Sequence, residues 1–176
     1  MSEDRKKIRR REREIAFRAI FQMDFQSDPE DLRKGMDQVL TGDAGFETED
    51  GGPGEDQEAA GTEDSAAAND YAVLLAHTVL DHAAEIDETI SAYLRDDWSL
   101  QRIPNAEKAI LRLSAAEMIF IKMPREIAIN EAVELAKQYG SDDAKVYING
   151  ILNNLAKDHA AAPPKKREAK TDDPGD

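Results

Sequence analysis

The sequence has 176 residues and contains no cysteine. This absence excludes disulfide bonds, thiolate metal ligands and thiol nucleophiles, and it fits a reducing compartment. Long apolar runs are also missing, because no stretch approaches the roughly 18 apolar residues that a membrane-spanning helix requires. The basic N-terminus is not followed by the apolar run of a signal peptide, since Arg18 interrupts the apolar segment 15–21. We therefore expect a cytoplasmic protein that does not associate with membranes.

Strand patterns and catalytic signatures are absent as well. No run of β-branched residues alternates between turn signals, so the fold class is predicted to be all-α. The sequence has no Walker A motif and no G-x-G-x-x-G, G-x-S-x-G or H-E-x-x-H pattern. His77 and His82 are five positions apart, which is not the one-turn spacing of a metal-binding pair, and His159 is remote from both. We predict a protein that is not an enzyme, with no catalytic residues, metal site or cofactor.

Negative charge dominates the chain, whose formal net charge is −14, but it is unevenly distributed. Residues 41–70 contain ten acidic residues and no basic ones, and the remainder has a formal charge of −4. The same segment has few large apolar residues, so we predict a disordered insertion at about 42–68. A solvated linker is the simpler interpretation. The alternative is an acidic segment that competes with nucleic acid for a basic site.

The counterpart of this acidity is a basic block at the start of the chain, Arg5-Lys6-Lys7-Ile8-Arg9-Arg10-Arg11-Glu12-Arg13, in which seven of nine residues are cationic. A dense basic block on an acidic protein favours a polyanionic ligand, of which nucleic acid is the commonest. Arginine forks onto phosphates and stacks on unpaired bases, which suits RNA. A flexible basic terminus without a specific ligand is the alternative.

Helical periodicity predicts six or seven helices. The expected ranges are 5–26, 29–41, 70–94 (one long helix, or two with a bend), 105–123, 125–139 and a last helix from 142. The helix 105–123 is apolar over much of its circumference and should be the most buried. In the first helix Ile8 lies on the apolar stripe. We expect the C-terminal half of this helix to be buried and the basic half to project into solvent. Asp28, Asn105 and Ser141 are predicted N-caps.

Three segments resemble the NusB family of bacterial transcription antitermination factors. They are Arg9–Phe21, Glu107–Arg112, and Ile127–Gly140 with its continuation through Tyr147–Leu152, in matching order and spacing from about 5 to 155. The resemblance implies an all-α fold of two small packed helical bundles. It also implies a single RNA-binding domain at 1–158, interrupted by the acidic insertion and followed by a disordered tail at 159–176.

The functional implication of the resemblance is RNA binding in transcription. A NusB-like protein would bind boxA-type single-stranded RNA in nascent ribosomal RNA transcripts, together with the small-subunit ribosomal protein NusE. The pair would join an RNA polymerase elongation complex and promote processive elongation. The alternatives are a non-catalytic protein-interaction adaptor and an accessory domain of an RNA cytosine methyltransferase. The latter is disfavoured because no cofactor-binding region or cysteine nucleophile is present.

The resemblance also assigns candidate RNA-binding residues: Arg5, Arg9, Arg10, Arg11, Arg13, Phe21, Glu107, Asp143 and Tyr147. Arginines supply the salt-dependent attraction to phosphate, and a tyrosine ring can stack on an unpaired base. We expect Tyr147 to lie beside the basic block. Glu12 departs from the family pattern, where a small residue is usual, and is expected to place a negative charge inside the basic patch.

Overall fold

The computed structural model describes residues 3–42 and 69–159. The helices are α1 (Glu3–Phe21), α2 (Pro29–Thr41), α4 (Asp70–Asp81), α5 (Ala83–Ser91), α6 (Asn105–Ile119), α7 (Arg125–Tyr139) and α8 (Ala144–His159), with short 3₁₀ turns η1 (Gln22–Asp24) and η2 (Leu100–Arg102). Neither described range contains a strand, which confirms the all-α prediction. None of the helices in these ranges combines the length and apolar character needed to span a bilayer.

Two predicted regions fall largely outside the described residues. Of the predicted insertion 42–68, only Gly42 is described, and it ends α2 in the left-handed conformation with φ of 78°. Of the predicted tail 159–176, only His159 is described, and it is the last residue of α8 rather than part of a tail.

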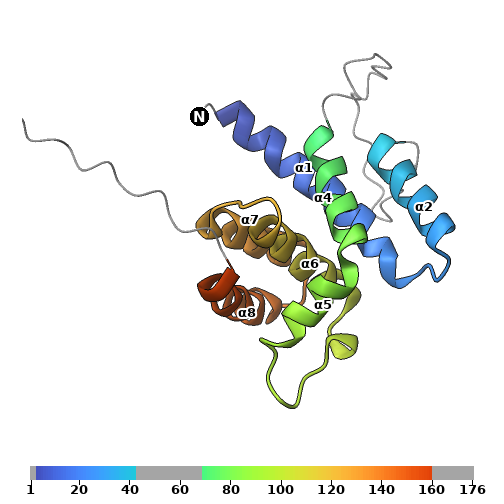
Figure 1. Cartoon of the computed structure of the whole chain (residues 1–176). Coiled ribbons are helices and arrows are strands. Elements are labelled where there is room, and N and C mark those ends of the chain that lie inside the picture. The colour runs from blue at the N-terminus through green and yellow to red at the C-terminus, as the bar shows by residue number, and fades with distance from the viewer. Residues whose placement is uncertain (1–2, 43–68, 160–176) are drawn as a thin grey trace, which may run out of the picture.

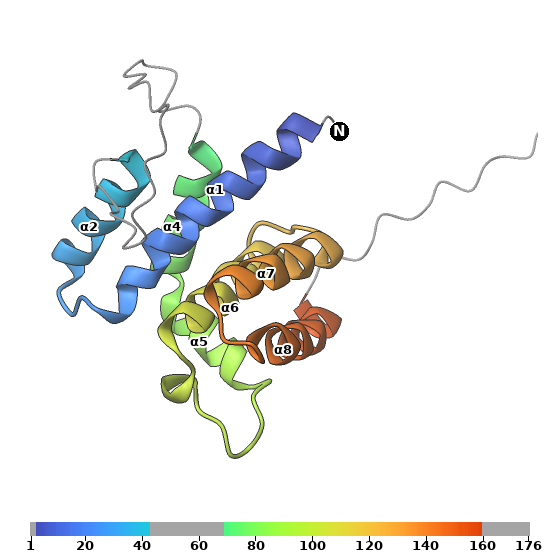
Figure 2. The same ribbon diagram turned by 180° about the vertical axis from the view of Figure 1, so that it is seen from behind.

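The helices form two packed groups around one central helix (Figures 1 and 2). Helices α1, α2 and α4 form the first bundle, and α5 to α8 form the second. Helix α6 packs against α1 and α4 as well as against α5, α7 and α8. Every residue from Glu107 to Met118 is buried, so the prediction of a central helix from its apolar circumference is confirmed.

Helix α1 is divided into an exposed half and a buried half. All residues from 3 to 11 are exposed, whereas Ala16, Phe17, Ala19 and Ile20 are buried in the core. This division matches the prediction. Ile8 lies on the apolar stripe but within the basic half, and it is 54% exposed. The start of α1 extends past the bundle in both ribbon views, which agrees with the exposure of this half of the helix.

The long periodic stretch after residue 70 forms two helices. Helix α4 ends at Asp81 and α5 begins at Ala83, with His82 between them. The His82 ring stacks on Phe120, with centroids 4.1 Å apart. Of the two alternatives predicted for this stretch, two helices with a bend is therefore correct.

Two of the predicted N-caps are wrong. Helix α6 starts at Asn105 itself, and Pro104 occupies the N-cap position without a side-chain hydrogen bond. Helix α8 starts at Ala144, and the Ser141 hydroxyl donates instead to the Glu107 carboxylate at 2.8 Å. Ser141 therefore joins the α7–α8 connection to α6.

Asp28 is the predicted cap that the structure confirms. Its carboxylate accepts from the backbone N–H groups of Glu30 at 2.9 Å and Asp31 at 3.1 Å. Replacing Asp28 with alanine should lower the free energy of unfolding by about 1 kcal/mol, because both N–H groups lose their acceptor. Urea denaturation followed by circular dichroism measures this change. Lys34→Ala, an exposed change on the same helix, is the matched control, and equal stability of the two variants would contradict the capping role.

The end of α2 and the start of α4 are in direct contact. The Asn69 side-chain amide donates to the Leu40 carbonyl at 3.2 Å. The two described ranges therefore meet at this hydrogen bond, next to the residues where each range ends.

Candidate nucleic-acid interface

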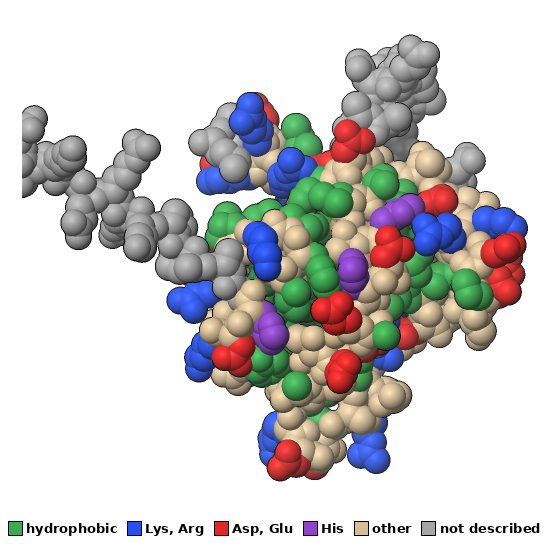
Figure 3. All heavy atoms as spheres, viewed as in Figure 1, with side chains coloured by type: hydrophobic (Ala, Val, Ile, Leu, Met, Phe, Trp, Pro, Cys, Tyr) green, Lys and Arg blue, Asp and Glu red, His purple; other side chains and the backbone are tan. Residues whose placement is uncertain are grey.

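The projecting start of α1 carries most of the predicted basic block on the surface. Its exposed cationic residues are Arg5, Lys6, Lys7, Arg9, Arg10 and Arg11. Figure 3 shows Lys and Arg side chains on the part of α1 that stands away from the rest of the molecule. Within the described ranges, Arg5, Lys7 and Arg11 have no carboxylate within ion-pair distance. Their charges are therefore available to an external anion.

Arg10 is held in place by α7. Its Nε and Nη2 donate to the two carboxylate oxygens of Glu131, each at 3.1 Å, in a bidentate pair. The hydrogen bond and charge of Glu131 raise the pKa of the Arg10 guanidinium above its usual value. The Arg10 side chain remains 59% exposed. It can therefore contact a ligand while Glu131 fixes its direction.

Arg13 lies inside the protein rather than on the surface. Its side chain is 5% exposed, and its Nε donates to the Glu117 Oε1 atom at 2.7 Å. The Tyr71 hydroxyl donates to the same oxygen at 2.6 Å. Burial raises the pKa of the Glu117 carboxyl, and the Arg13 charge opposes that shift. This network joins α1, α4 and α6, so Arg13 fixes the helix that carries the other arginines.

Glu12 also turns inward, contrary to the expectation that its charge lies inside the basic patch. It is 4% exposed. Its Oε1 accepts from the backbone N–H of Tyr71 at 3.1 Å, and its Oε2 accepts from Arg9 at 3.0 Å. The carboxylate therefore satisfies an N–H in the first turn of α4, and its charge does not reach the exposed face.

A groove separates the basic half of α1 from the start of α7. Its volume is about 590 Å³. Arg5, Arg9 and Arg10 line one side, and Met123 and Ile127 provide an apolar side. Ile127 is 44% exposed. The groove thus offers cations for phosphate next to an apolar surface.

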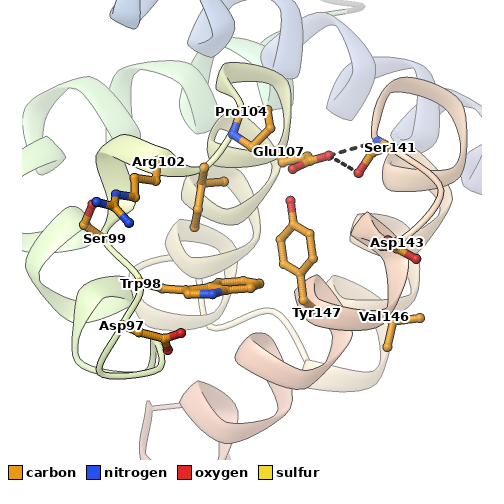
Figure 4. Close-up of a pocket in the computed structure, with 11 residues that line it drawn as sticks. Asp97, Trp98, Ser99, Arg102, Pro104, Glu107, Ser141, Asp143, Val146 and Tyr147 are labelled. Carbon is orange, nitrogen blue, oxygen red and sulfur yellow. Dashed lines mark hydrogen bonds between the residues drawn. The ribbon is translucent and has the colours of Figure 1, made fainter.

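The other predicted residues form a second cluster. Glu107, Asp143 and Tyr147 line a cavity of about 700 Å³ that also contains Trp98 (Figure 4). Glu107 is 2% exposed, and its Oε1 accepts from the Ser141 backbone N–H at 2.9 Å and from the Ser141 hydroxyl at 2.8 Å. The carboxylate thus has a structural role at this cavity as well as a place in its wall.

The structure separates this second cluster from the basic block. Arg13 meets α6 at Glu117, and Glu107 lies ten residues earlier on that helix, roughly 15 Å away along the axis. Tyr139, at the end of α7, packs on Phe17 with ring centroids 4.7 Å apart and donates to Glu14, so α7 meets α1 beyond the basic block. Tyr147 therefore does not lie directly beside the arginines.

Phe21 belongs to neither cluster. It is half-buried against the core, and its ring is 6.3 Å from that of Phe17 and 5.1 Å from that of Phe25. It lies at the end of α1, about 24 Å along the helix from Arg5. It therefore lies at the far end of α1 from the projecting arginines.

Three residues of these clusters were not predicted from the sequence. Glu131 lies in a segment that carried the family resemblance, but nothing in its spacing indicated a partner on α1. Tyr71 supports Arg9, whose guanidinium carbon is 4.3 Å from the centre of the ring. Trp98 lies in a loop, where it is 39% exposed. It is the only tryptophan in the chain, and this was the one sequence signal that could have identified it. The described residues contain no group of three or more histidine, aspartate or glutamate side chains suited to a metal ion.

Comparisons with curated proteins find relatives with one shared description. Transcription antitermination protein NusB of Bacillus subtilis is 46% identical over 85 residues, which are 48% of this chain and 64% of that protein. The protein of the same description from Crocosphaera subtropica is 44% identical over 90 residues, which are 51% of this chain and 42% of that protein. The matched regions thus span less than two thirds of these relatives.

Solved structures show the same fold over a larger share of the chain. T. maritima NusB superposes with a TM-score of 0.66 at 32% identity, covering 87% of this chain and 93% of that one. A chain from a crystal structure of antitermination factors NusB and NusE in complex with dsRNA superposes with a TM-score of 0.65 at 24% identity. The superposition covers 87% of this chain and 98% of that one, and it shows that the two share a fold. The family model described as the NusB family matches residues 10–157. Because that match covers most of the chain and agrees with its fold, this protein belongs to the NusB family.

Proposed function

We propose that this protein is a non-enzymatic RNA-binding factor in transcription antitermination. In this proposal it binds boxA-type RNA in nascent ribosomal RNA transcripts together with NusE, and the complex promotes processive elongation by RNA polymerase in the cytoplasm. The relatives described as transcription antitermination proteins support the activity. The fold neighbour that was solved with NusE and dsRNA supports the partner and the class of ligand.

The observation that carries the proposal is the exposed arginine surface of α1. It stands on a helix whose other half is anchored in the core, so the charges are presented on a rigid support. The protein as a whole has a formal charge of −14, so this basic surface does not follow from composition. We propose that Arg5, Arg9, Arg10 and Arg11 contact RNA phosphates, and that Arg13 positions them from inside.

The remaining predicted residues form the second part of the proposed interface. Tyr147, Glu107 and Asp143 surround a cavity suited to a base rather than to a phosphate, because two of the three are carboxylates. Cavities of this kind accept bases that are already unstacked, which is why we propose single-stranded RNA as the ligand. We retain Phe21, at the C-terminal end of α1, as a proposed RNA contact outside both clusters.

The test of the arginine surface is the salt dependence of RNA binding. Replacing Arg5 and Arg11 with alanine removes two charges that have no ion-pair partner among the described residues, so no ion pair within the protein is broken. The slope of log affinity against log salt concentration should become shallower by about 1.4 units, since each phosphate contact with a single strand contributes about 0.7. Fluorescence anisotropy with a labelled boxA-like RNA across a salt series measures it, with and without NusE.

The matched control removes two exposed cations from α2, Arg33 and Lys34, and should leave the slope unchanged. If both double variants keep the slope of the unmodified protein, the arginine surface does not bind RNA. A protein that still binds NusE under those conditions would then be a protein-interaction adaptor.

A further inference from the structure

We propose that the cavity lined by Trp98 and Tyr147 accepts a single unstacked nucleobase, which stacks on Trp98 and donates an N–H group to Glu107. The inference deepens the proposed function and rests on it, because it takes RNA as the ligand. It adds Trp98, which lies in the loop between α5 and α6, to the residues that contact RNA.

The loop holds Trp98 in a defined position. The Trp98 backbone N–H donates to the Arg95 carbonyl at 2.9 Å. Two residues later, Leu100 begins η2 and is buried with 7% exposure, and Ile103 follows with 5% exposure. These anchors fix the loop to the core on one side of the tryptophan. A base that stacked there would meet an aromatic surface already in place.

Trp98 and Tyr147 form two walls of the cavity at nearly right angles. Their ring centroids are 5.4 Å apart and their planes are inclined by 85° (Figure 4). The Trp98 side chain is not covered by the core, since the residue is 39% exposed. The volume of about 700 Å³ is within the range of small-ligand cavities and is ample for one base. A flat aromatic ligand can thus lie on one ring while its edge meets the other.

The polar groups of the cavity favour a base edge over a phosphate. The Tyr147 hydroxyl oxygen is buried and has no hydrogen-bond partner among the described residues, so a ligand could pair with it. Glu107, Asp97 and Asp143 are carboxylates in the cavity wall, against one cation, Arg102. This balance repels phosphate, and it favours a ligand that donates hydrogen bonds. The exocyclic amino group of cytosine or adenine meets that requirement, whereas uracil presents carbonyl oxygens on both sides of its single N–H.

The test uses the fact that Trp98 is the only tryptophan in the chain. A base that stacks on its indole will quench its fluorescence, so emission reports on this cavity alone. The full-length protein is titrated with single-stranded decamers of cytidine and of uridine, and affinity is measured in parallel by anisotropy of the labelled RNAs. We expect the cytidine decamer to quench Trp98 emission more strongly than the uridine decamer. Trp98→Leu should weaken binding of the cytidine decamer about tenfold, the size of one lost stacking contact.

Two further variants distinguish stacking from a general effect on the fold. Trp98→Phe retains an aromatic face and should recover much of the lost affinity. Phe25→Leu removes another exposed aromatic side chain outside the cavity and should leave the affinity unchanged. Circular dichroism of each variant shows whether the helices are intact.

The outcomes separate the inference from the proposed function. RNA that binds with unchanged Trp98 emission, and with equal affinity for the unmodified protein and Trp98→Leu, would overturn the base cavity while leaving the arginine surface in place. Equal quenching by the two decamers would overturn the role of Glu107. Failure of every RNA to bind in the anisotropy measurement would overturn the proposed function together with the cavity.

Discussion

Replacing Arg13 with methionine is expected to lower the free energy of unfolding by about 3–5 kcal/mol, because it leaves the Glu117 carboxylate without its counter-charge in the core. Glu117 has 0% exposure, and its Oε2 atom has no hydrogen-bond partner among the described residues. Water therefore cannot compensate for the missing guanidinium. Urea denaturation followed by circular dichroism measures the loss. Arg11→Met, the same chemical change at an exposed position of α1, should alter stability by less than about 0.5 kcal/mol.

The loss in Arg13→Met should depend on pH. Burial raises the pKa of the Glu117 carboxyl, and removal of Arg13 raises it further because Arg13 opposes the shift. A carboxyl whose folded pKa exceeds its unfolded pKa binds a proton more tightly in the folded state, so stability falls as pH rises. The variant should therefore lose stability relative to the unmodified protein as pH rises above the ordinary titration range of a glutamate carboxyl. Adding Glu117→Gln should recover part of the loss at pH 8. A pH-independent loss that this second change does not reduce would mean that Glu117 is not the charge responsible.

Replacing Arg112 with methionine is expected to lower the free energy of unfolding by about 3 kcal/mol. Arg112 is 6% exposed. Its Nε and Nη2 donate to the Asp87 carboxylate at 2.7 and 2.8 Å, and its Nη1 donates to Asp24 at 3.1 Å. The side chain thus joins α6 to α5 and to the turn that follows α1. Because the two carboxylates are partly exposed and can be hydrated, we place the loss at the lower end of the range for broken buried pairs.

The control for Arg112 is Arg33→Met, which breaks the exposed pair with Asp81 and should cost less than about 1 kcal/mol. Thermal and urea unfolding of the two variants compare the sites directly. If Arg112→Met were as mild as Arg33→Met, the charged contacts of Arg112 would add nothing to the packing of the two bundles.

The fold could be predicted from the sequence wherever apolar periodicity decides the structure. The circumference of 105–123 is apolar on nearly all sides, and only a helix surrounded by others can bury such a pattern. The bend at His82 could not be fixed in advance, because the periodicity continues through it and the break depends on local geometry at one residue. The caps expected at Asn105 and Ser141 failed because a proline supplied the N-cap position of α6 and because Ser141 found a carboxylate on α6.

The candidate site was predictable in part. The exposure of the arginines follows from the lack of an apolar stripe in the first half of α1. The inward direction of Arg13 and Glu12 does not, since it depends on Glu117 and Tyr71, which are distant in the sequence. Helical spacing indicates which residues share a face. It does not indicate which charged side chain finds a buried partner on another helix.

The hydrogen bond between Asn69 and the Leu40 carbonyl has a consequence for how this family can change. Because the helix ends on either side of the connection are hydrogen-bonded to each other, the number of residues that join them has little bearing on the packing of α2 and α4 within the first bundle. Each doubling of a flexible connection costs only about 0.6 kcal/mol in closure entropy. Evolution can therefore lengthen, shorten or recharge this connection while the helices stay unchanged. The same position suits an inserted epitope or fluorescent label for following the protein in living cells.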